Sequence, residues 1–463
     1  MPPSKVIKLR TPKHAPKLAP VDGSITAPRG FRASGVHCDI KRLGTGSGSD
    51  KGDKRDLALI VSDAPATVAG LFTTNQICAA PVRLCIERVR RGVARAIVVN
   101  SGNANACTGS RGRADAQAMT AAAARALGLR VADVLVGSTG RIGVTLPMAN
   151  VRAGIAAAAL QLGPERASAA HAAEAIMTSD TRAKEIAVEF DLGGRRVRIG
   201  GIGKGAGMIQ PGMSVTGRRP AARPGSSLGL HATMLCFLTT DAAIAAAPLR
   251  SALERAVASS FNRITVDGDM STNDTVLALA NGLADHAPIT SARGAGFTTF
   301  VSALEHVCLA IALMIVRDGE GVHRVVTVRV TGARSFAEAD AAARSIANSS
   351  LVKTSWHGGD PNWGRILDAA GYSDARIDEH KVDIGYSTPG SRHIVWSLRR
   401  GRPARTPFAA LWHAVQPAEF DVHVRLNLGP GAAVMYAADL TEAYVDFNKG
   451  TIADPDDATS LGG

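Results

Sequence analysis

The sequence has few aromatic residues and few cysteines, and both shortages narrow what the protein can be. Phe, Trp and Tyr make up 4% of the 463 residues, and the six cysteines form no C-x-x-C pair. The sequence also has no H-E-x-x-H motif and no His/Cys cluster with zinc-like spacing, so it predicts neither a disulfide framework nor a metal site. Unpaired cysteines are typical of a reducing compartment, and we expect the cytoplasm.

A long uncharged apolar run is missing as well. The most apolar stretch, 301–316, contains Glu305 and His306 and is too short to span a bilayer. We interpret it as a buried helix and expect no association with a membrane. Residues 1–28 are basic and Pro-rich but lack the apolar core of a secretory signal, so we expect a disordered basic tail there.

Acidic residues are fewer than basic ones, 40 against 53, which gives a formal net charge of +13. The basic residues are spread along the chain, with no dense run and no interleaved aromatic residues. Nucleic-acid-binding proteins commonly show such a stripe or stacking surface. The charge therefore argues against a nucleic-acid partner and favours attraction of small anionic substrates.

The chain is long enough for two or three lobes, and 46% apolar with 20% charged residues is typical of a globular protein. Short apolar runs rich in β-formers alternate with Ala-rich helical patterns. The predicted strands contain Leu57–Val61, Ala96–Val99, Val134–Val136, Ile186–Phe190, Val197–Ile199, Val325–Val330 and Phe420–Leu426. The predicted helices lie at 114–127, 150–160, 165–177, 247–260, 299–316 and 336–349. This mixture predicts a layered α/β or α+β fold.

Five polar segments rich in Gly or Asn interrupt this pattern, and loops of this kind often bear active sites. They lie at 99–109, 137–143, 203–213, 261–275 and 360–365. The GKGAG stretch at 203–207 lacks the spacing of a phosphate-binding loop, so we predict no nucleotide site. Asp267, Asp269 and Asp274 could hold a cation, but without EF-hand spacing they fit turn and cap positions equally well.

The Ala232–Thr233 bond carries the most specific chemistry. A small residue precedes a threonine, and the apolar run that follows predicts a buried strand. A threonine hydroxyl can attack its own preceding carbonyl if the backbone is strained and the developing oxyanion is held. Cleavage would free the α-amino group of Thr233, whose ordinary pKa of about 7.7–8 suits a general base for the neighbouring hydroxyl. An Ala-Thr pair before a strand is common, so this pattern alone is weak.

Longer motifs strengthen that interpretation, because the sequence resembles the ornithine acetyltransferase family, also called bifunctional glutamate N-acetyltransferase/amino-acid acetyltransferase. The likeness runs in order from near Gly30 to about Asn448. The segments that carry it are VNSGNANACTG (99–109), STGRIG (138–143), GKGAGMI (203–209), ATMLCFLTTDA (232–242), FNRITVDGDMSTNDT (261–275), VRDGEG (316–321) and DPNWGRI (360–366).

The resemblance implies a self-processing fold with an N-terminal threonine nucleophile. Residues 29–232 would form an α chain and 233–463 a β chain, assembled as a heterotetramer of two α and two β chains. Thr233 would take acetyl from N2-acetylornithine and pass it to glutamate, in arginine biosynthesis, with no metal or organic cofactor. Whether acetyl-CoA is a further donor stays open.

The resemblance also assigns roles to individual residues. Thr139 and Gly140 match the pair that forms the oxyanion hole, which a tetrahedral adduct requires. The positions that match substrate-binding residues are Thr181, Lys204, Thr233, Glu320 and Asn448. Lys204 would supply a cation for the substrate carboxylates and Glu320 an acid for the ornithine amine.

Three features depart from the family pattern. Residues 214–231 are an insertion before the cleavage point, which we expect to be a surface loop. Asn448 is followed by Lys-Gly-Thr-Ile-Ala, so a further Thr or Ser contact is missing or displaced, and Arg141 stands where a small apolar residue is common. Two alternatives therefore stay open: an N-terminal-nucleophile hydrolase or aminopeptidase of similar architecture, and a non-catalytic member whose insertion blocks maturation.

Overall fold

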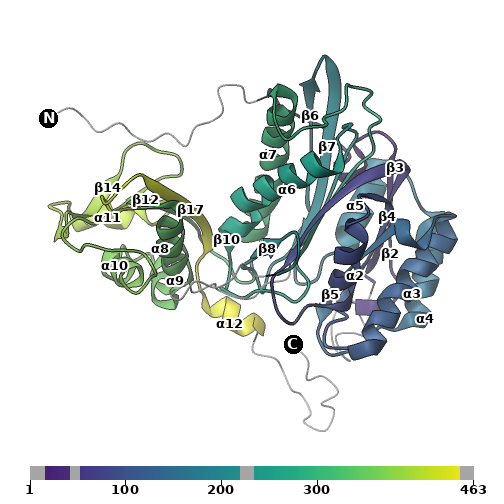
Figure 1. The fold of residues 1–463 in the computed structure, drawn as a ribbon. Helices are drawn as coiled ribbons and strands as arrows, with labels where there is room; N and C mark the ends of the chain where they lie inside the picture. The colour runs from purple at the N-terminus through teal and green to yellow at the C-terminus, as the bar shows by residue number, and fades with distance from the viewer. Residues whose placement is uncertain (1–15, 42–52, 219–233, 449–463) are drawn as a thin grey trace, which may run out of the picture.

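Two lobes, each built on a β-sheet, make up the computed structural model, which describes residues 16–41, 53–218 and 234–448 (Figure 1). Within these residues the larger lobe holds a ten-stranded sheet. Its strands are β1 (Ala19–Pro20), β2 (Phe31–Val36), β3 (Leu57–Thr73), β4 (Val93–Asn103), β5 (Val134–Arg141), β6 (Lys184–Leu192), β7 (Arg195–Lys204), β8 (Met213–Ser214), β9 (Leu235–Thr240) and β11 (Thr275–Ala280). The order is β1-β6-β7-β9-β11-β3-β4-β5, with β2 and β8 paired to β3.

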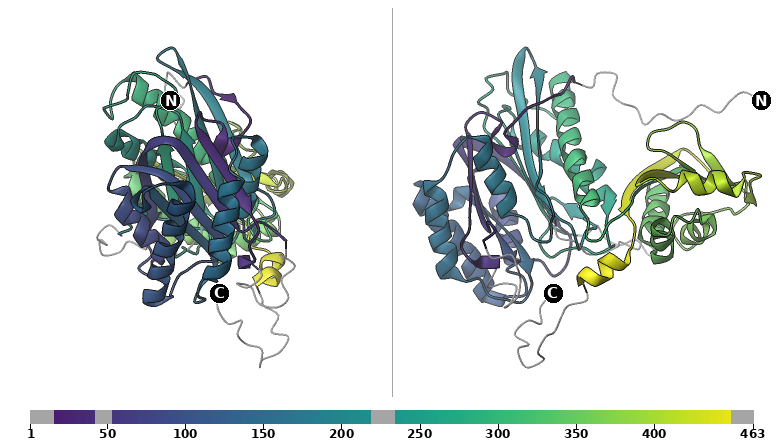
Figure 2. Two further views of the ribbon diagram at one scale, coloured as in Figure 1. Left: turned by 90° about the vertical axis from the view of Figure 1, so that its right-hand side faces the viewer. Right: turned by 180° about the vertical axis from the view of Figure 1, so that it is seen from behind.

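The smaller lobe holds a seven-stranded sheet within the described part of the chain, in the order β10-β17-β12-β16-β13-β14-β15. Its strands are β10 (Ile264–Thr265), β12 (Val325–Ala333), β13 (Asp383–Ser387), β14 (Val395–Arg399), β15 (Arg402–Pro403), β16 (Glu419–Arg425) and β17 (Gly431–Ala438). Four helices accompany this sheet: α8 (Phe336–Asn348), α9 (Ser350–His357), α10 (Trp363–Gly371) and α11 (Phe408–Ala414). A last helix, α12 (Glu442–Asn448), lies between the two lobes in the view from behind (Figure 2).

The larger sheet separates two apolar cores. One core contains residues of α2 (Ala80–Val89), α3 (Gly109–Leu127), α4 (Met148–Leu160) and α5 (Arg166–Ala175), and the other those of α6 (Ala246–Ser259) and α7 (Ala295–Arg317). Successive side chains of a strand point to opposite faces. Accordingly Leu235 and Phe237 of β9 join the first core, whereas Cys236 and Leu238 join the second. This explains why the sequence after Thr233 is apolar without alternation.

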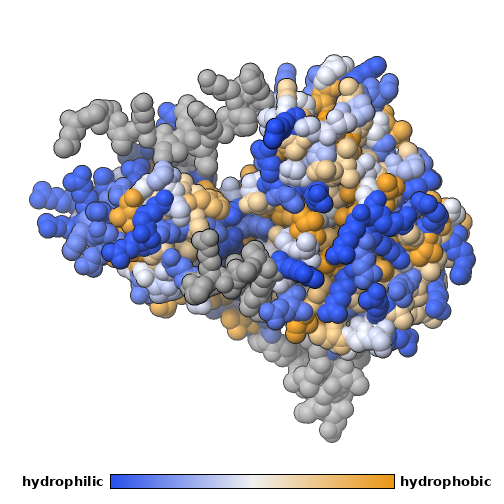
Figure 3. All heavy atoms as spheres, viewed as in Figure 1, coloured by the Kyte–Doolittle hydropathy of each residue, from blue (hydrophilic) through white to orange (hydrophobic). Residues whose placement is uncertain are grey.

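Helix α7 confirms the buried helix expected over 301–316. By length and composition alone it could cross a membrane. Its apolar side chains, among them Phe300, Val307 and Ile311, pack instead into the core that α7 shares with α6 and the sheet. On the face of the molecule visible in Figure 3, hydrophilic side chains are interspersed with small apolar patches over both lobes.

The expected tail over 1–28 is wrong from residue 16 onward, while 1–15 lie outside the described residues. Strand β1 pairs with β6, and a short 3-10 turn at Ser24–Thr26 is buried, with Ile25 fully enclosed. The few apolar side chains in this Pro-rich segment, among them Leu18 and Ile25, form no periodic pattern, so composition alone could not show this anchor.

The insertion expected over 214–231 begins inside the sheet. Strand β8 places Met213 and Ser214 opposite Thr73 and Phe72 of β3, and Val215 packs against the second core. The remaining residues of the insertion from 219 onward lie outside the described part of the chain. The interpretation as a surface loop is therefore corrected for its first two residues.

Candidate functional site

Ends of the four strands β7, β11, β4 and β5 lie near the start of β9, the strand whose sequence follows Thr233. Lys204, the last residue of β7, is paired with Leu235, the first residue of β9, and Leu235 is paired in turn with Thr275, the first residue of β11. Near the ends of β4 and β5, Ser101 is paired with Thr139. The ammonium group of Lys204 lies 3.4 Å from Thr139 Oγ1 and joins the two groups of strands.

The Asn273 side chain makes a second connection. Its amide Nδ2 donates to the backbone oxygens of Ala104, at 2.7 Å, and Ser138, at 2.8 Å. Asn273 is buried, so these bonds are shielded from water. Four of the five polar segments singled out in the sequence therefore meet at one place.

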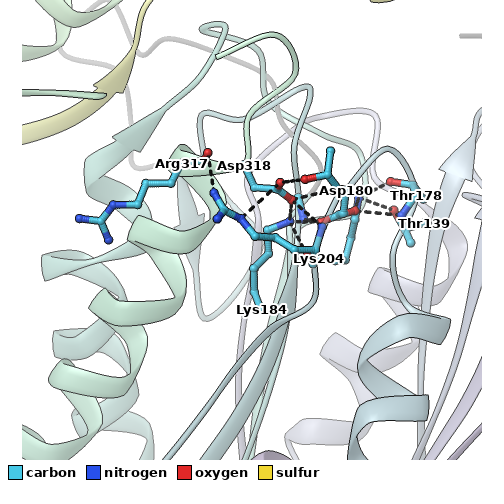
Figure 4. Close-up of polar contacts among 10 residues, drawn as sticks. Thr139, Thr178, Asp180, Lys184, Lys204, Arg317 and Asp318 are labelled. Atoms are coloured by element: carbon cyan, nitrogen blue, oxygen red, sulfur yellow. Dashed lines mark hydrogen bonds and ion pairs between the residues drawn. The ribbon is translucent and has the colours of Figure 1, made fainter. Parts of the chain in front are cut away.

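Lys204 is buried and surrounded by hydroxyl groups (Figure 4). Its Nζ donates to Thr178 Oγ1 at 2.7 Å and lies 3.9 Å from the Asp180 carboxylate. Burial lowers the pKa of Lys204 below its ordinary value, although Asp180 opposes the shift. Lys204 is not a solvated surface residue, because its side chain is 3% exposed.

A second buried lysine, Lys184, holds two carboxylates together (Figure 4). Its ammonium group forms ion pairs with Asp180 and Asp318. Asp180 also accepts hydrogen bonds from the backbone N–H groups of Gly205, at 2.7 Å, and Thr178, at 2.9 Å. Burial opposes ionisation of Asp180, but the two lysines and the Gly205 amide outweigh it and hold its pKa below the ordinary value.

The predicted oxyanion residues lie on β5. Thr139 is buried, and its Oγ1 accepts from Lys204, which leaves the hydroxyl proton free to donate elsewhere. Gly140 has φ of 129°, a conformation that L side chains rarely adopt, and a Cβ there would come within 2.3 Å of the Gly102 carbonyl carbon. Only glycine fits this position, because the strand passes directly against β4.

The residues at the proposed cleavage point, Ala232 and Thr233, lie outside the described residues, and the described chain resumes at Met234. The Met234 N–H donates to Asp274 Oδ1 at 2.6 Å, and its carbonyl accepts from the Thr275 N–H at 3.0 Å. Asp274 is fully buried, and its Oδ2 has no hydrogen-bond partner among the residues that the structure describes. Burial raises the pKa of Asp274 well above the ordinary range. Asp274 therefore fixes the backbone directly after Thr233, a role that its turn-like sequence context did not reveal.

Glu320 lies over the glycine-rich turn that follows β7. Its backbone N–H donates to the Ala206 oxygen at 3.0 Å, and a Cβ on Gly207 would come within 2.2 Å of its carboxylate. Asn448, at the end of α12, donates from Nδ2 to Glu320 Oε2 at 3.1 Å. The absence of a side chain at Gly207 thus makes room for the Glu320 carboxylate.

Thr181 and the polar segment 360–365 were also singled out in the sequence, and the structure gives them other contacts. Thr181 donates from its backbone N–H, at 3.1 Å, and from its hydroxyl to Asp318, so it supports the lysine–carboxylate network. The polar segment 360–365 lies in the smaller lobe, where the Asn362 side chain caps α10 and donates to Asp360. Among the described contacts, none joins that segment to Lys204.

Fold and site together define a layered α/β enzyme in which buried ammonium, hydroxyl and carboxyl groups face the start of one central strand. The chain belongs to the ArgJ family, whose model matches residues 32–450. Proteins named arginine biosynthesis bifunctional protein ArgJ are similar over nearly their whole length. The one from Symbiobacterium thermophilum is 45% identical over 92% of this chain and 98% of its own, and that from Geobacter sulfurreducens is 44% identical over 91% and 98%.

Solved structures show a further likeness. An ArgJ protein from Bacillus halodurans is 36% identical with a TM-score of 0.39, covering 43% of this chain and 100% of its own. The ornithine acetyltransferase of Mycobacterium tuberculosis, solved with ornithine, is 37% identical with a TM-score of 0.38, covering 42% and 100%. The family match and the full-length relatives confirm the prediction that this chain is an acetyltransferase of arginine biosynthesis.

Proposed function

We propose that this chain cleaves itself between Ala232 and Thr233 and then carries acetyl on Thr233 from N2-acetylornithine to glutamate. The observation that carries the proposal is the position of β9. Its first residue, Leu235, lies between Lys204 and Thr275, and the preceding Met234 is bonded to the buried Asp274. A nucleophile at residue 233 would therefore be attached to a rigid strand beside a buried ammonium group, which is the preorganisation that acyl transfer requires.

Thr139 and Gly140 are proposed to stabilise the oxyanion in both self-cleavage and acetyl transfer. The hydroxyl proton of Thr139 is free to donate, because its oxygen already accepts from Lys204. The close approach of Gly140 to β4 keeps this part of the chain rigid. Donors that are fixed before the reaction lose little energy in reorganisation, and each is worth about 2.7–4 kcal/mol of barrier.

The substrate-binding roles are divided by charge. Lys204 is proposed to bind a carboxylate of either substrate, and Glu320 the side-chain amine of the ornithine moiety. Asn448 is proposed to contact substrate and to hold Glu320 in place, since the two side chains are hydrogen-bonded. Thr181 is proposed to contribute from its position beside Asp318.

The rest of the proposal concerns assembly. Residues 29–232 and 233–463 would remain associated as α and β chains, because β7 and β9 are neighbours in one sheet although the cleavage point lies between them. Two of each chain would form a heterotetramer in the cytoplasm. No metal or organic cofactor takes part in the proposed acetyl transfer.

Steady-state kinetics with both substrates tests this function. A ping-pong mechanism gives parallel double-reciprocal lines when N2-acetylornithine and glutamate are varied together, and N-acetylglutamate should equal the ornithine released. Free acetate produced without a requirement for glutamate would contradict the proposal and favour the N-terminal-nucleophile hydrolase. The same assay with acetyl-CoA in place of acetylornithine decides whether it is a second donor.

A further inference from the structure

A separate group of ionisable side chains lies where the smaller lobe meets α12. His323 follows α7, His357 ends α9, and Asp439 follows β17. One ligand atom from each lies within 4.8 Å of the others, and the two imidazole rings are 5.1 Å apart between centroids. None of these residues takes part in the acetyl-transfer chemistry proposed above.

The Asp439 carboxylate is fixed with one oxygen unsatisfied. Its Oδ1 accepts from the backbone N–H groups of His323, at 3.0 Å, and Arg324, at 3.1 Å. The side chain is 0% exposed, and within the described part of the chain its Oδ2 has no hydrogen-bond partner. A buried carboxylate oxygen without a partner is costly, so this atom requires a positive group beside it.

His357 faces that oxygen. Its Nε2 lies 2.8 Å from Glu442 Oε2, and its Nδ1 lies 3.4 Å from Asp439 Oδ2 without hydrogen-bond geometry. Since a carboxylate only accepts, the Nε2 atom carries the proton in the neutral ring. The Nδ1 lone pair then points toward another lone-pair atom, and the two repel unless a cation lies between them.

The Nδ1–Oδ2 separation suits a shared metal ion. Ligands bound tetrahedrally to zinc at about 2.0–2.1 Å lie about 3.3 Å apart. The observed 3.4 Å is close to this edge length. The His323 ring is exposed and offers a nitrogen within 4.8 Å of these two atoms, so the ring must move closer to complete the group.

We propose that His357 Nδ1, Asp439 Oδ2 and a ring nitrogen of His323 bind one divalent transition-metal ion, with zinc as the best match. Two imidazoles with one carboxylate suit zinc and its neighbours, whereas calcium and magnesium prefer oxygen ligands alone. Glu442 acts as the outer partner, because its bond to Nε2 fixes the ring tautomer, as carboxylates commonly do for metal-bound histidines. Lys353 also lies near Asp439, but its ammonium group donates to the Ala438 oxygen.

The ion would fasten two segments that meet at the larger site. His323 follows Glu320 in one loop, and Asp439 precedes α12, whose last residue is Asn448. The Thr441 hydroxyl already donates to the Gly321 oxygen at 2.7 Å, so the loop and the start of α12 touch. A metal here would therefore strengthen the link between the loop and α12 without entering the reaction. The proposal does not depend on the acetyl-transfer mechanism.

Calorimetric titration of the chelator-treated full chain with Zn²⁺ alone tests the site. We expect one ion per chain and a rise in melting temperature on binding. His357→Ala and Asp439→Asn should each abolish stoichiometric binding, and Glu442→Gln should weaken it by about 10–100-fold. His323→Ala removes a ligand from an exposed position, so it keeps the test valid if Asp439→Asn does not fold.

His380→Ala is the matched control, because His380 is exposed and contacts only Glu379 among the described ion pairs. It should bind Zn²⁺ as the unaltered chain does. The proposal is overturned if the unaltered chain binds no stoichiometric Zn²⁺, if His380→Ala loses binding as His357→Ala does, or if Mg²⁺ competes at equal concentration. If the unaltered chain binds no stoichiometric Zn²⁺, these side chains form an ion pair in which a protonated His357 lies between the carboxylates of Asp439 and Glu442.

Discussion

Replacing either of two buried lysines by methionine should affect different properties. Lys204→Met should mainly lower activity, whereas Lys184→Met should mainly lower stability. Lys184 holds the carboxylates of Asp180 and Asp318, whereas Lys204 donates mainly to hydroxyl groups and lies 3.9 Å from Asp180. In Lys204→Met, Asp180 keeps Lys184 and two backbone N–H donors. No buried charge is left unpaired, so the free energy of unfolding should change by no more than about 1.5 kcal/mol.

The activity of Lys204→Met should fall steeply. If Lys204 binds a substrate carboxylate, the lost charged hydrogen bond is worth about 1.5–3 kcal/mol. Because about 1.4 kcal/mol corresponds to a factor of ten, kcat/KM should fall by about 10- to 150-fold. Lys184→Met instead leaves both Asp180 and Asp318 without their shared ammonium group, and breaking a buried pair costs about 3–5 kcal/mol of stability.

Urea unfolding and steady-state kinetics distinguish the two variants. Unfolding is measured on chains that also carry Thr233→Ala, so that every molecule is uncut, and kinetics on the single variants. If Lys204→Met lost as much stability as Lys184→Met while its folded fraction kept the original kcat/KM, Lys204 would be structural and the proposed binding role would be wrong.

Other substitutions test single interactions. Glu320→Gln should raise the KM for N2-acetylornithine more than that for glutamate, because only the former presents a side-chain amine; equal increases would argue for a structural role. Gly140→Ala should lower the melting temperature through about 1–3 kcal/mol of backbone strain, before any contact with Gly102 is counted; an unchanged melting temperature would contradict the observed backbone. Burial raises the pKa of Asp274, so the folded chain holds a proton that the unfolded chain releases above about pH 4. The contribution of this group to stability should therefore decrease as pH rises from about 4 toward the folded pKa, and Asp274→Asn should remove that slope from urea unfolding.

Local patterns predicted most of the larger lobe. Every predicted strand run lies within an observed strand, except that Phe420–Leu426 extends one residue beyond β16, and every predicted helix overlaps an observed one. The predicted helices bury an apolar face, and central strands such as β3 bury both faces at Leu57–Val61; in each case the apolar pattern is a local property of the sequence. Helices α9 and α10 were not predicted, since they are short and begin at side-chain caps, Ser349 and Asn362, in polar surroundings.

The site was only partly predictable. Periodicity and spacing located the polar segments, but the roles of Thr139, Lys204 and Glu320 came from the family resemblance. Lys184 and Asp318 were missed because their ion pair joins residues far apart in the chain, and nothing local marks it. The zinc site proposed here was missed for the same reason: His323, His357 and Asp439 are spaced much more widely than the ligands of short zinc motifs.

Mass spectrometry of the purified protein tests the central claim most directly. We expect two polypeptides, residues 1–232 and 233–463, with the second beginning Thr-Met-Leu-Cys-Phe, and a brief incubation with N2-acetylornithine should add one acetyl group to that N-terminal threonine. Thr233→Ala should give a single uncut chain of 47.9 kDa that takes up no acetyl. An uncut but active chain, or acetyl on any other residue, would contradict the account.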